Sequence, residues 1–348
     1  MRPAPIRPPK LAAGDRVAVL SPSFAAPAEF PALHQRAMQR LRQDFGLVPV
    51  EFPTTRRHAS PQERADDLMA AYADPGNRAV FATIGGNDQI TVLRHLDPAP
   101  FRADPKPFFG YSDNTNLLNW LWYHGVGAYH GMSTQVFLSR ASGPGPELSA
   151  SLRAALFTGG DLEIEPVAEF REDELDWADT EAALTGSVPS YPSPGRVWHR
   201  AGRVVSGPTW GGNLEILHGT LAANRWMRPV EDYAGCVLLL ETSEEMPSAT
   251  EVFEMLRNFG ERGLLEHFPA VLVGTAKATF IHSPRPVEQR AAYREQQREA
   301  VLKAFAAYHP EAMIVFGVDF GHIDPQWVLP YGGRMTVDGV AQTITAHY

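Results

Sequence analysis

The amino-acid sequence predicts an α/β fold with two domains, because two series of strands and helices are separated by an irregular stretch. From residue 16 to residue 123, short apolar runs alternate with segments of helical periodicity. That order is typical of a parallel sheet with helices on both faces. Between residues 159 and 207 the alternation stops, and a second series begins after residue 207.

The first series predicts an N-terminal domain over residues 1–160, with a sheet of the flavodoxin or Rossmann kind. Its expected strands lie at 16–20, 47–52, 79–84 and 106–109, and its expected helices at 27–45, 61–72, 88–95 and from 114 onward. Active sites in such sheets lie beyond the carboxyl ends of the strands. Residues 85–86 and 112 each follow one of these strands, so we expect them at that edge.

The interruption and the second series define the other two parts of the chain. Residues 161–206 are predicted to form an interdomain linker and substrate loop, because acids are frequent in 161–177 and serine and proline in 187–195. Residues 207–348 are predicted to form a smaller C-terminal α/β domain, with the active site between the two domains. Its expected elements are helices at 214–221, 247–258 and 286–308, strands at 235–240, 270–274 and 312–318, and a hairpin at 334–345.

Composition and charge exclude several classes of protein. The chain has 348 residues and a formal net charge of −9, without the basic block that tracks a nucleic-acid polymer. Cys236 is the only cysteine, which excludes an intrachain disulfide and a metal site with several thiolates. The start of the chain lacks the apolar core of a signal peptide, and no apolar run approaches ~18 residues. We therefore expect a cytoplasmic protein with no membrane partner.

The segment Gly110-Tyr111-Ser112-Asp113 joins an expected strand to an expected helix. A serine in a tight strand-to-helix turn is held away from the backbone, and the N–H groups that begin the helix favour negative charge beside it. Such a serine is suited to act as a nucleophile. The alternative from this segment alone is that Ser112 or Asp113 only caps the helix.

Two further residues supply the other parts of a nucleophilic relay. Glu241 ends the apolar run 238–240, and His322 follows an apolar run that ends at residue 318. Serine, acid and histidine at the carboxyl ends of three strands have the chemistry of a nucleophile, an orienting acid and a general base. Each could instead be structural. With a histidine base, activity should fall below about pH 6, where the imidazole becomes protonated.

Five motifs, in this order along the chain, resemble those of a known family. They are Gly85-Gly86, Gly110-Tyr111-Ser112-Asp113, Gly211-Gly212-Asn213-Leu214, Glu241 and Gly321-His322. The series resembles the LD-carboxypeptidase family of serine peptidases, which includes the microcin C self-immunity protein MccF, and the resemblance extends from residue 14 to residue 332. It implies a catalytic triad of Ser112, Glu241 and His322 that uses no metal and no cofactor.

The resemblance also implies the groups around the triad. Backbone N–H groups of Gly86 and Asp113 would form the oxyanion hole, with Gly85 beside the substrate. The two glycines could equally serve a tight turn that needs positive φ. The side-chain amide of Asn213 would reach a substrate carbonyl, or would cap the helix that follows it.

For substrate binding, the resemblance points to two branches of the family. A tryptophan of the immunity protein stacks on the nucleobase from the corresponding loop, which implies that role for Trp177. The alternatives for Trp177 are a loop anchor or a contact at a dimer interface. The long segment 161–210, with Trp177, Trp198 and Trp210, resembles the immunity branch more than the short carboxypeptidases. A lysine of the immunity protein helps position substrate, whereas this chain has Glu244 and Glu245 there.

Other kinds of site fit the sequence less well. An α/β-hydrolase has the same order of serine, acid and histidine, but this chain lacks the second glycine of the usual elbow. His124 and His130 do not have a helical metal spacing, so we expect them at the surface or behind the site residues. Gly85-Gly86-Asn87-Asp88 lacks the third glycine of a nucleotide-cofactor fingerprint.

The sequence therefore predicts a metal-independent serine carboxypeptidase or amidase that cuts an amide bond in a peptidyl- or aminoacyl-nucleotide. One alternative substrate is the murein tetrapeptide of cell-wall recycling. A further alternative is a non-catalytic homologue that only binds its ligand. The expected partners are the small substrate and a second copy of the chain in a homodimer.

Overall fold

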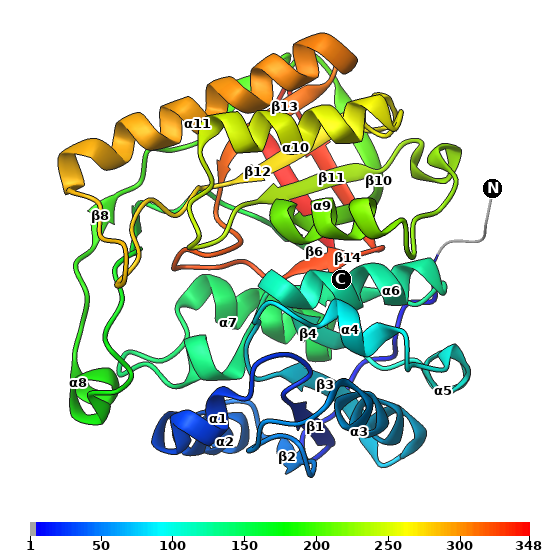
Figure 1. The fold of residues 1–348 in the computed structure, drawn as a ribbon, viewed down its shortest axis with the longest axis vertical. Helices are drawn as coiled ribbons and strands as arrows, with labels where there is room; N and C mark the ends of the chain where they lie inside the picture. Colours follow the sequence, from blue (N-terminus) through cyan, green and yellow to red (C-terminus); the bar gives the residue numbers. More distant parts are fainter. Residues whose placement is uncertain (1–4) are drawn as a thin grey trace.

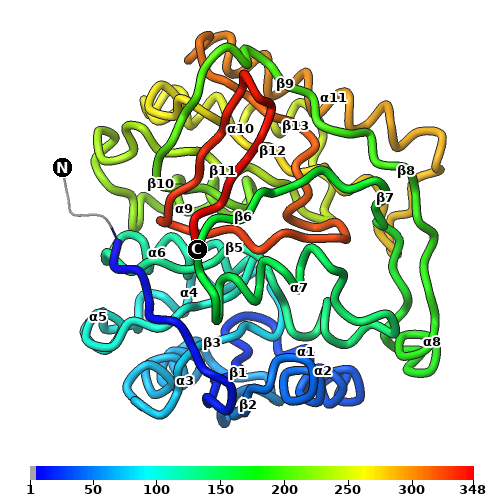
Figure 2. The backbone as a smooth tube through the Cα atoms, turned by 180° about the vertical axis from the view of Figure 1, so that it is seen from behind, coloured from blue at the N-terminus to red at the C-terminus, as the bar shows by residue number. Residues whose placement is uncertain are grey.

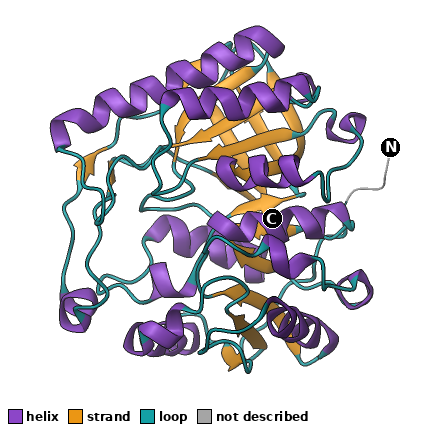
Figure 3. Ribbon diagram, viewed as in Figure 1, coloured by secondary structure: helices purple, strands orange, loops and turns teal. Residues whose placement is uncertain are grey.

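The computed structural model describes residues 5–348 and confirms the α/β class. The first four residues of the predicted N-terminal domain lie outside the described part. Two sheets, one of six and one of eight strands, carry most of the strands, and helices pack around them (Figures 1 and 3). No helix among residues 5–348 combines the length and the apolar character that a membrane crossing requires.

The six-stranded sheet has the order β14-β5-β4-β3-β1-β2. Its parallel strands are β1 (Arg16–Leu20), β2 (Val48–Glu51), β3 (Asn77–Ala82), β4 (Phe108–Gly110) and β5 (Ala128–His130), and β14 (Leu329–Tyr331) joins the edge antiparallel to β5. The helices of this half are α1 (Ala26–Glu29), α2 (Pro31–Gln43), α3 (Pro61–Ala73), α4 (Ile90–Leu93), α5 (Pro98–Ala103), α6 (Thr115–Tyr123) and α7 (Pro146–Arg153). All four predicted strands are present, β1 with the predicted bounds and the other three with shifted ends.

One predicted helix is divided in two. The sequence suggests a single helix over 27–45, but α1 ends at Glu29 and α2 begins at Pro31. The proline ring disfavours helical backbone at the residue before it, and Pro31 has no N–H to continue the first helix. Phe30 is thereby left at the corner between the helices, where its ring faces the cavity described below.

The eight-stranded sheet has the order β6-β16-β15-β10-β11-β12-β13-β9. Its strands are β6 (Asp161–Glu163), β9 (Val197–His199), β10 (Val204–Asn213), β11 (Val237–Glu241), β12 (Ala270–Gly274), β13 (Met313–Val318), β15 (Arg334–Asp338) and β16 (Thr343–His347). The helices are α9 (Leu214–Ala223), α10 (Ala249–Glu261) and α11 (Val287–Tyr308), of which α10 and α11 cover one face (Figure 1). The predicted hairpin is confirmed, with β15 antiparallel to β16.

The amino-acid sequence does not predict strand β10, because its glycines interrupt the pattern of strand-forming residues. Gly207, Gly211 and Gly212 lower the strand propensity of this segment. The structure nevertheless needs two of them, since a Cβ on Gly207 or on Gly211 would lie 2.0 Å from a backbone oxygen of Gly235 or Leu239. Close approach of neighbouring backbones explains these glycines.

The irregular middle of the chain connects the two halves of the molecule. Residues 171–190, called the strap below, leave β7 (Glu169–Phe170), descend to α8 (Thr180–Thr185) and return to β8 (Tyr191–Pro192) (Figure 2). In the first half, α8 packs against α2. Because β6 and β9 join the second sheet and β14 joins the first, the domain boundaries at 160 and 207 stay a prediction.

Candidate active site

Ser112 occupies a strained turn at the carboxyl end of β4. Its backbone φ is 60°, in the left-handed region that residues other than glycine rarely adopt. A short 3₁₀ turn (Ser112–Asn114) follows and leads into α6. Strain of this kind persists where the surrounding structure enforces it, and it holds a nucleophilic serine out of the backbone.

The turn after β3 brings bare backbone against Ser112. A Cβ on Gly85 would lie 2.8 Å from both Cβ and Oγ of Ser112 and 3.3 Å from the backbone nitrogen of Asp113. Gly86 has φ +155°, and a Cβ there would lie 2.2 Å from Oγ of Ser23. Close contacts therefore favour a glycine at both positions, and the positive φ of Gly86 favours one there as well.

Asp113 fastens these two turns together. Its side chain is 1% exposed, and Oδ2 accepts hydrogen bonds from the backbone N–H groups of Asp88 (3.0 Å) and Gln89 (2.9 Å) and from the hydroxyl of Ser23. Oδ1 accepts from the Asn116 side chain at 2.8 Å. The helix α6 has no side-chain cap, so Asp113 acts as a link between turns, not as a cap.

Replacement of Gly85 by alanine tests the contact with Ser112. The added methyl group must displace the Ser112 side chain, and a displacement near 1 Å costs roughly 10²-fold in turnover. We therefore expect kcat/KM of Gly85→Ala to fall by about that factor with little change in the midpoint of thermal unfolding. Gly202→Ala is the matched control, because a Cβ at Gly202 meets no atom within 4 Å. Equal activity of the two variants would contradict the contact.

Glu241 and His322 form a buried, hydrogen-bonded pair, the second part of the candidate site. The ring nitrogen Nδ1 of His322 donates to Oε2 of Glu241 at 2.5 Å. Glu241 ends β11, and its side chain fits between Gly274 and Gly321, where a Cβ on Gly321 would lie 2.7 Å from Oε2. Burial alone would raise the pKa of Glu241, but the charge and hydrogen bond of His322 hold it below its ordinary value. The carboxylate is thus kept ionised beside the imidazole.

The second nitrogen of His322 faces another carboxylate. Nε2 lies 3.2 Å from Oε2 of Glu244, and neither atom has a hydrogen-bond partner among residues 5–348. Burial lowers the pKa of His322, but the charges of Glu241 and Glu244 outweigh it and raise the pKa to about 9. In this arrangement the imidazole keeps its proton at neutral pH, well above the pH 6 expected from an unperturbed histidine.

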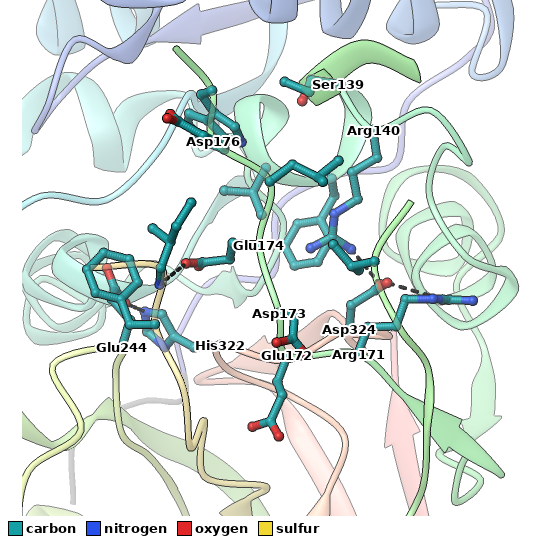
Figure 4. Close-up of a pocket in the computed structure, with 18 of the residues that line it drawn as sticks. Ser139, Arg140, Arg171, Glu172, Asp173, Glu174, Asp176, Glu244, His322 and Asp324 are labelled. Atoms are coloured by element: carbon teal, nitrogen blue, oxygen red, sulfur yellow. Dashed lines mark hydrogen bonds and ion pairs between the residues drawn. The ribbon is translucent and has the colours of Figure 1, made fainter. Parts of the chain in front are cut away.

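The Ser112 turn, His322 and the strap line one cavity of about 660 Å³. Gly85, Gly86, Ser112, Glu244 and His322 line it. Figure 4 shows His322 and Glu244 on one side of this cavity and Asp324 between Arg140 and Arg171 on the other. Ser112 and His322 thus line one cavity, and Glu241 is hydrogen-bonded to His322, while their roles as a triad stay a prediction.

Trp177 lines the same cavity from the strap. Its ring lies edge-on to Phe30, with 5.4 Å between the ring centroids. The other two tryptophans of the long segment do not reach the cavity. Trp198 lies in β9 opposite Val315, and Trp210 is buried in β10, where its indole N–H donates to Asn119 at 2.9 Å.

Asn213 caps helix α9, which is one of the two roles expected for it. Its side-chain oxygen accepts from the backbone N–H of Ile216 at 3.0 Å and caps α9. The residue is 1% exposed and does not line the cavity. Contact with a substrate carbonyl stays a prediction.

His130 lies behind Glu241, at the core of the molecule. It is fully buried at the end of β5, with Nε2 4.0 Å from Oε1 of Glu241. Burial lowers its pKa to about 4, so it is neutral. His124, in contrast, packs at the end of α6 against Trp120.

Several cavity residues were not found from the sequence. The ammonium group of Lys277 pairs with Glu174 of the strap. Asp324 lies 2.7 Å from Arg140 and 3.4 Å from Arg171. Lys277 follows the end of β12, so the rule that parallel sheets bind ligands beyond their carboxyl ends could have indicated it.

Comparison with known families agrees with this geometry. The family model of the LD-carboxypeptidase N-terminal domain matches residues 17–131, and that of the LD-carboxypeptidase C-terminal domain matches residues 206–337. This chain belongs to the LD-carboxypeptidase family. The matched ranges include the Ser112 elbow and Gly85-Gly86 in the first model and Glu241 and His322 in the second.

Relatives in the family have two kinds of name. A probable murein peptide carboxypeptidase of Bacillus subtilis is 26% identical over 97% of this chain and 93% of its own length. The microcin C7 self-immunity protein MccF of Escherichia coli is 24% identical over 94% of this chain and 92% of its own length.

Solved structures of MccF proteins have the same fold. MccF in complex with aspartyl sulfamoyl adenosine superposes with a TM-score of 0.82 at 20% identity and covers 99% of both chains. An MccF-like protein of Streptococcus pneumoniae in complex with AMP superposes at 0.81 with 23% identity, covering 96% of this chain and 99% of its own. At these identities the likeness establishes the fold of this LD-carboxypeptidase, and no more.

Proposed function

We propose that this member of the family is a metal-independent serine peptidase of the cytoplasm that hydrolyses an amide-type bond in an aminoacyl- or peptidyl-nucleotide. Ser112 is the nucleophile, His322 the base and Glu241 the group that orients His322. The expected assembly is a homodimer. The observation that carries the proposal is that Ser112, His322 and Trp177 line the same cavity.

The chemistry follows from the groups at the elbow. Once Nε2 of His322 has lost its own proton, it accepts the proton of the Ser112 hydroxyl as Oγ bonds to the acyl carbon, and the carbonyl electrons move onto the oxygen. Backbone N–H groups of Gly86 and Asp113 stabilise that oxyanion. His322 then protonates the leaving nitrogen as its bond to the acyl carbon breaks, which leaves an ester on Ser112. Water, deprotonated by His322, attacks this ester and releases the acid.

Trp177 provides a surface for the leaving group. It is half-buried, packs edge-on against Phe30 and lines the cavity that Ser112 also lines. An aromatic ring accepts any nucleobase by stacking. Two relatives of the same fold bind AMP and aspartyl sulfamoyl adenosine, which supports a nucleotide here.

Replacement of Trp177 by alanine measures this contribution. Stacking of one base on an aromatic ring is worth about 1–3 kcal/mol, so KM for an aminoacyl-nucleotide should rise by roughly 5- to 150-fold. Cleavage of a murein tetrapeptide, which has no base, should change far less. Trp177→Phe is the control that keeps an aromatic face and should retain most of the affinity. An equal loss on both substrates would mean that Trp177 only anchors the strap.

The murein tetrapeptide remains the second candidate, because a relative of nearly full length has the name of a murein peptide carboxypeptidase. Steady-state hydrolysis of an aspartyl sulfamoyl adenosine and of a murein tetrapeptide, measured in parallel, separates the two. We expect a higher kcat/KM for the nucleotide. A higher value for the tetrapeptide would move the assignment to cell-wall recycling, and hydrolysis of neither together with tight binding would indicate a ligand-binding homologue.

A further inference from the structure

Glu244 presents a carboxylate to the catalytic base without a hydrogen-bond partner of its own. Its Oε2 is buried and lies 3.2 Å from Nε2 of His322, and no donor among residues 5–348 binds it. Figure 4 shows this side chain directed at the imidazole from the loop after β11. The reaction needs Nε2 for the proton of Ser112. The carboxylate therefore lies where it competes with the nucleophile.

The loop that carries Glu244 is fixed by the fold. The backbone N–H and the hydroxyl of Ser243 donate to Oε1 of Glu215 at 2.9 and 2.8 Å, and Glu215 belongs to the first turn of α9. Met246, two residues beyond Glu244, has a positive φ of 51°. A residue other than glycine adopts that conformation only where its surroundings enforce it. The backbone on either side of Glu244 is therefore held in place, which directs its side chain toward His322.

The cations that line the cavity are already engaged elsewhere. Lys277 pairs with Glu174, and Arg140 and Arg171 both face Asp324. None of these three neutralises Glu244, whose ion pair is with the base itself. A carboxylate that leaves the base during the reaction is stabilised by another positive charge, and a cationic group on a ligand would supply one.

Covalent geometry identifies which positive group of a ligand can arrive there. In an aminoacyl compound the α-nitrogen is about 2.5 Å from the acyl carbon, because only the Cα atom separates them. When the acyl carbon contacts Oγ of Ser112, the α-ammonium group stays beside the nucleophile, in the cavity that His322 and Glu244 also line.

We propose that Glu244 binds the free α-ammonium group of the acyl residue, and that this group draws its carboxylate away from Nε2 of His322. The substrate is then a single aminoacyl group on a nucleotide, and a substrate whose α-nitrogen is acylated is a poor one. This inference rests on the proposed function and narrows its substrate class. Glu244 is the specificity-determining residue, and it keeps the base occupied until the correct substrate arrives.

Aspartyl sulfamoyl adenosine and its Nα-acetyl derivative test the proposal directly. Wild-type enzyme should prefer the free amine in kcat/KM by roughly 10- to 100-fold, the range for a hydrogen bond between charged groups. In Glu244→Gln this ratio should fall to within about threefold, because the free amine loses its partner and the Nα-acetyl compound no longer meets a carboxylate on the base. Glu245→Gln is the matched control, because Glu245 is exposed and does not line the cavity.

The pH profile of kcat/KM gives a second readout that a structural role would not change. His322 faces Glu241 from β11, Glu244 from the loop, Lys277 from the segment after β12 and the edge of Tyr111, and neutral His130 lies behind Glu241. Glu244→Gln removes one of the two carboxylates beside His322. The acidic limb of the kcat/KM profile, measured with the Nα-acetyl substrate, should therefore shift to lower pH by roughly one unit. Glu245→Gln should leave the limb in place.

Each outcome decides a different claim. If wild-type enzyme hydrolyses both compounds equally, or if Glu244→Gln keeps the wild-type preference, the role of Glu244 is overturned and the nucleotide substrate class stands. If wild-type enzyme hydrolyses neither compound, the proposed function fails and the role of Glu244 fails with it. A preference that disappears in Glu244→Gln and persists in Glu245→Gln supports the proposal.

Discussion

Replacement of Ser112 by alanine is expected to lower kcat by about six orders of magnitude, the effect of removing the serine of a serine triad. The carbonyl carbon then has no covalent partner, and His322 has no hydroxyl to activate. Alanine has the same backbone freedom as serine at φ 60°, so the fold should survive. The measurement is single-turnover hydrolysis of aspartyl sulfamoyl adenosine, with thermal unfolding as the test of integrity.

Ser142→Ala is the matched control for that variant. Ser142 lines the same cavity, but its hydroxyl donates only to the backbone oxygen of Gly143, at 3.3 Å. It should retain kcat within a factor of about two, as expected for an exposed side chain without a partner in the site. If Ser112→Ala hydrolyses the substrate at a rate near that of Ser142→Ala, Ser112 is not the nucleophile.

The second large effect concerns the buried pair of Glu241 and His322. His322→Ala should lower kcat about as much as Ser112→Ala, because the two residues act as one unit. Glu241→Gln should lower kcat by roughly 10⁴-fold, since its amide can donate to Nδ1 and hold the wrong tautomer of the imidazole. Stopped-flow or endpoint assays of both variants measure these factors. A loss below tenfold in either variant would remove that residue from the relay.

The smaller loss expected for Glu241→Gln than for His322→Ala depends on how closely the structure encloses Glu241. Glu241 is enclosed by Gly274, Gly321 and His130, so its carboxylate has little room to reorient. The isosteric glutamine therefore stays in place and changes only the hydrogen-bond pattern. Thermal unfolding of Glu241→Gln should remain cooperative, which separates loss of chemistry from loss of fold.

Local patterns in the sequence are sufficient to predict the parts of the fold that repeat. They place strands of buried apolar residues such as β1, β3 and β13 close to their true bounds, because apolar periodicity is set by the strand itself. They miss the long strand β10, because Gly207, Gly211 and Gly212 are there for contacts with neighbouring backbone. A pattern within one segment carries no record of what lies against it.

The candidate site likewise has residues that the sequence predicts and contacts that only the structure shows. Ser112, Glu241 and His322 each follow an apolar run, and their order along the chain resembles one family, so the amino-acid sequence alone is enough to propose them. The bridge from Asp113 to the turn after Gly86, and the contact of Glu244 with His322, join residues far apart in sequence. Such pairings depend on the order of the strands within each sheet, which no local spacing encodes.

The most direct test of the central proposal is covalent labelling of the nucleophile. Intact enzyme is treated with a fluorophosphonate, digested, and the modified peptide is identified by mass spectrometry, with His322→Ala treated in parallel. We expect one adduct, on Ser112, formed at least ~100-fold faster in the wild-type protein than in His322→Ala, as general-base activation predicts. An adduct on another residue, or labelling of Ser112 at the same rate in both proteins, would contradict the proposed relay of Ser112, Glu241 and His322.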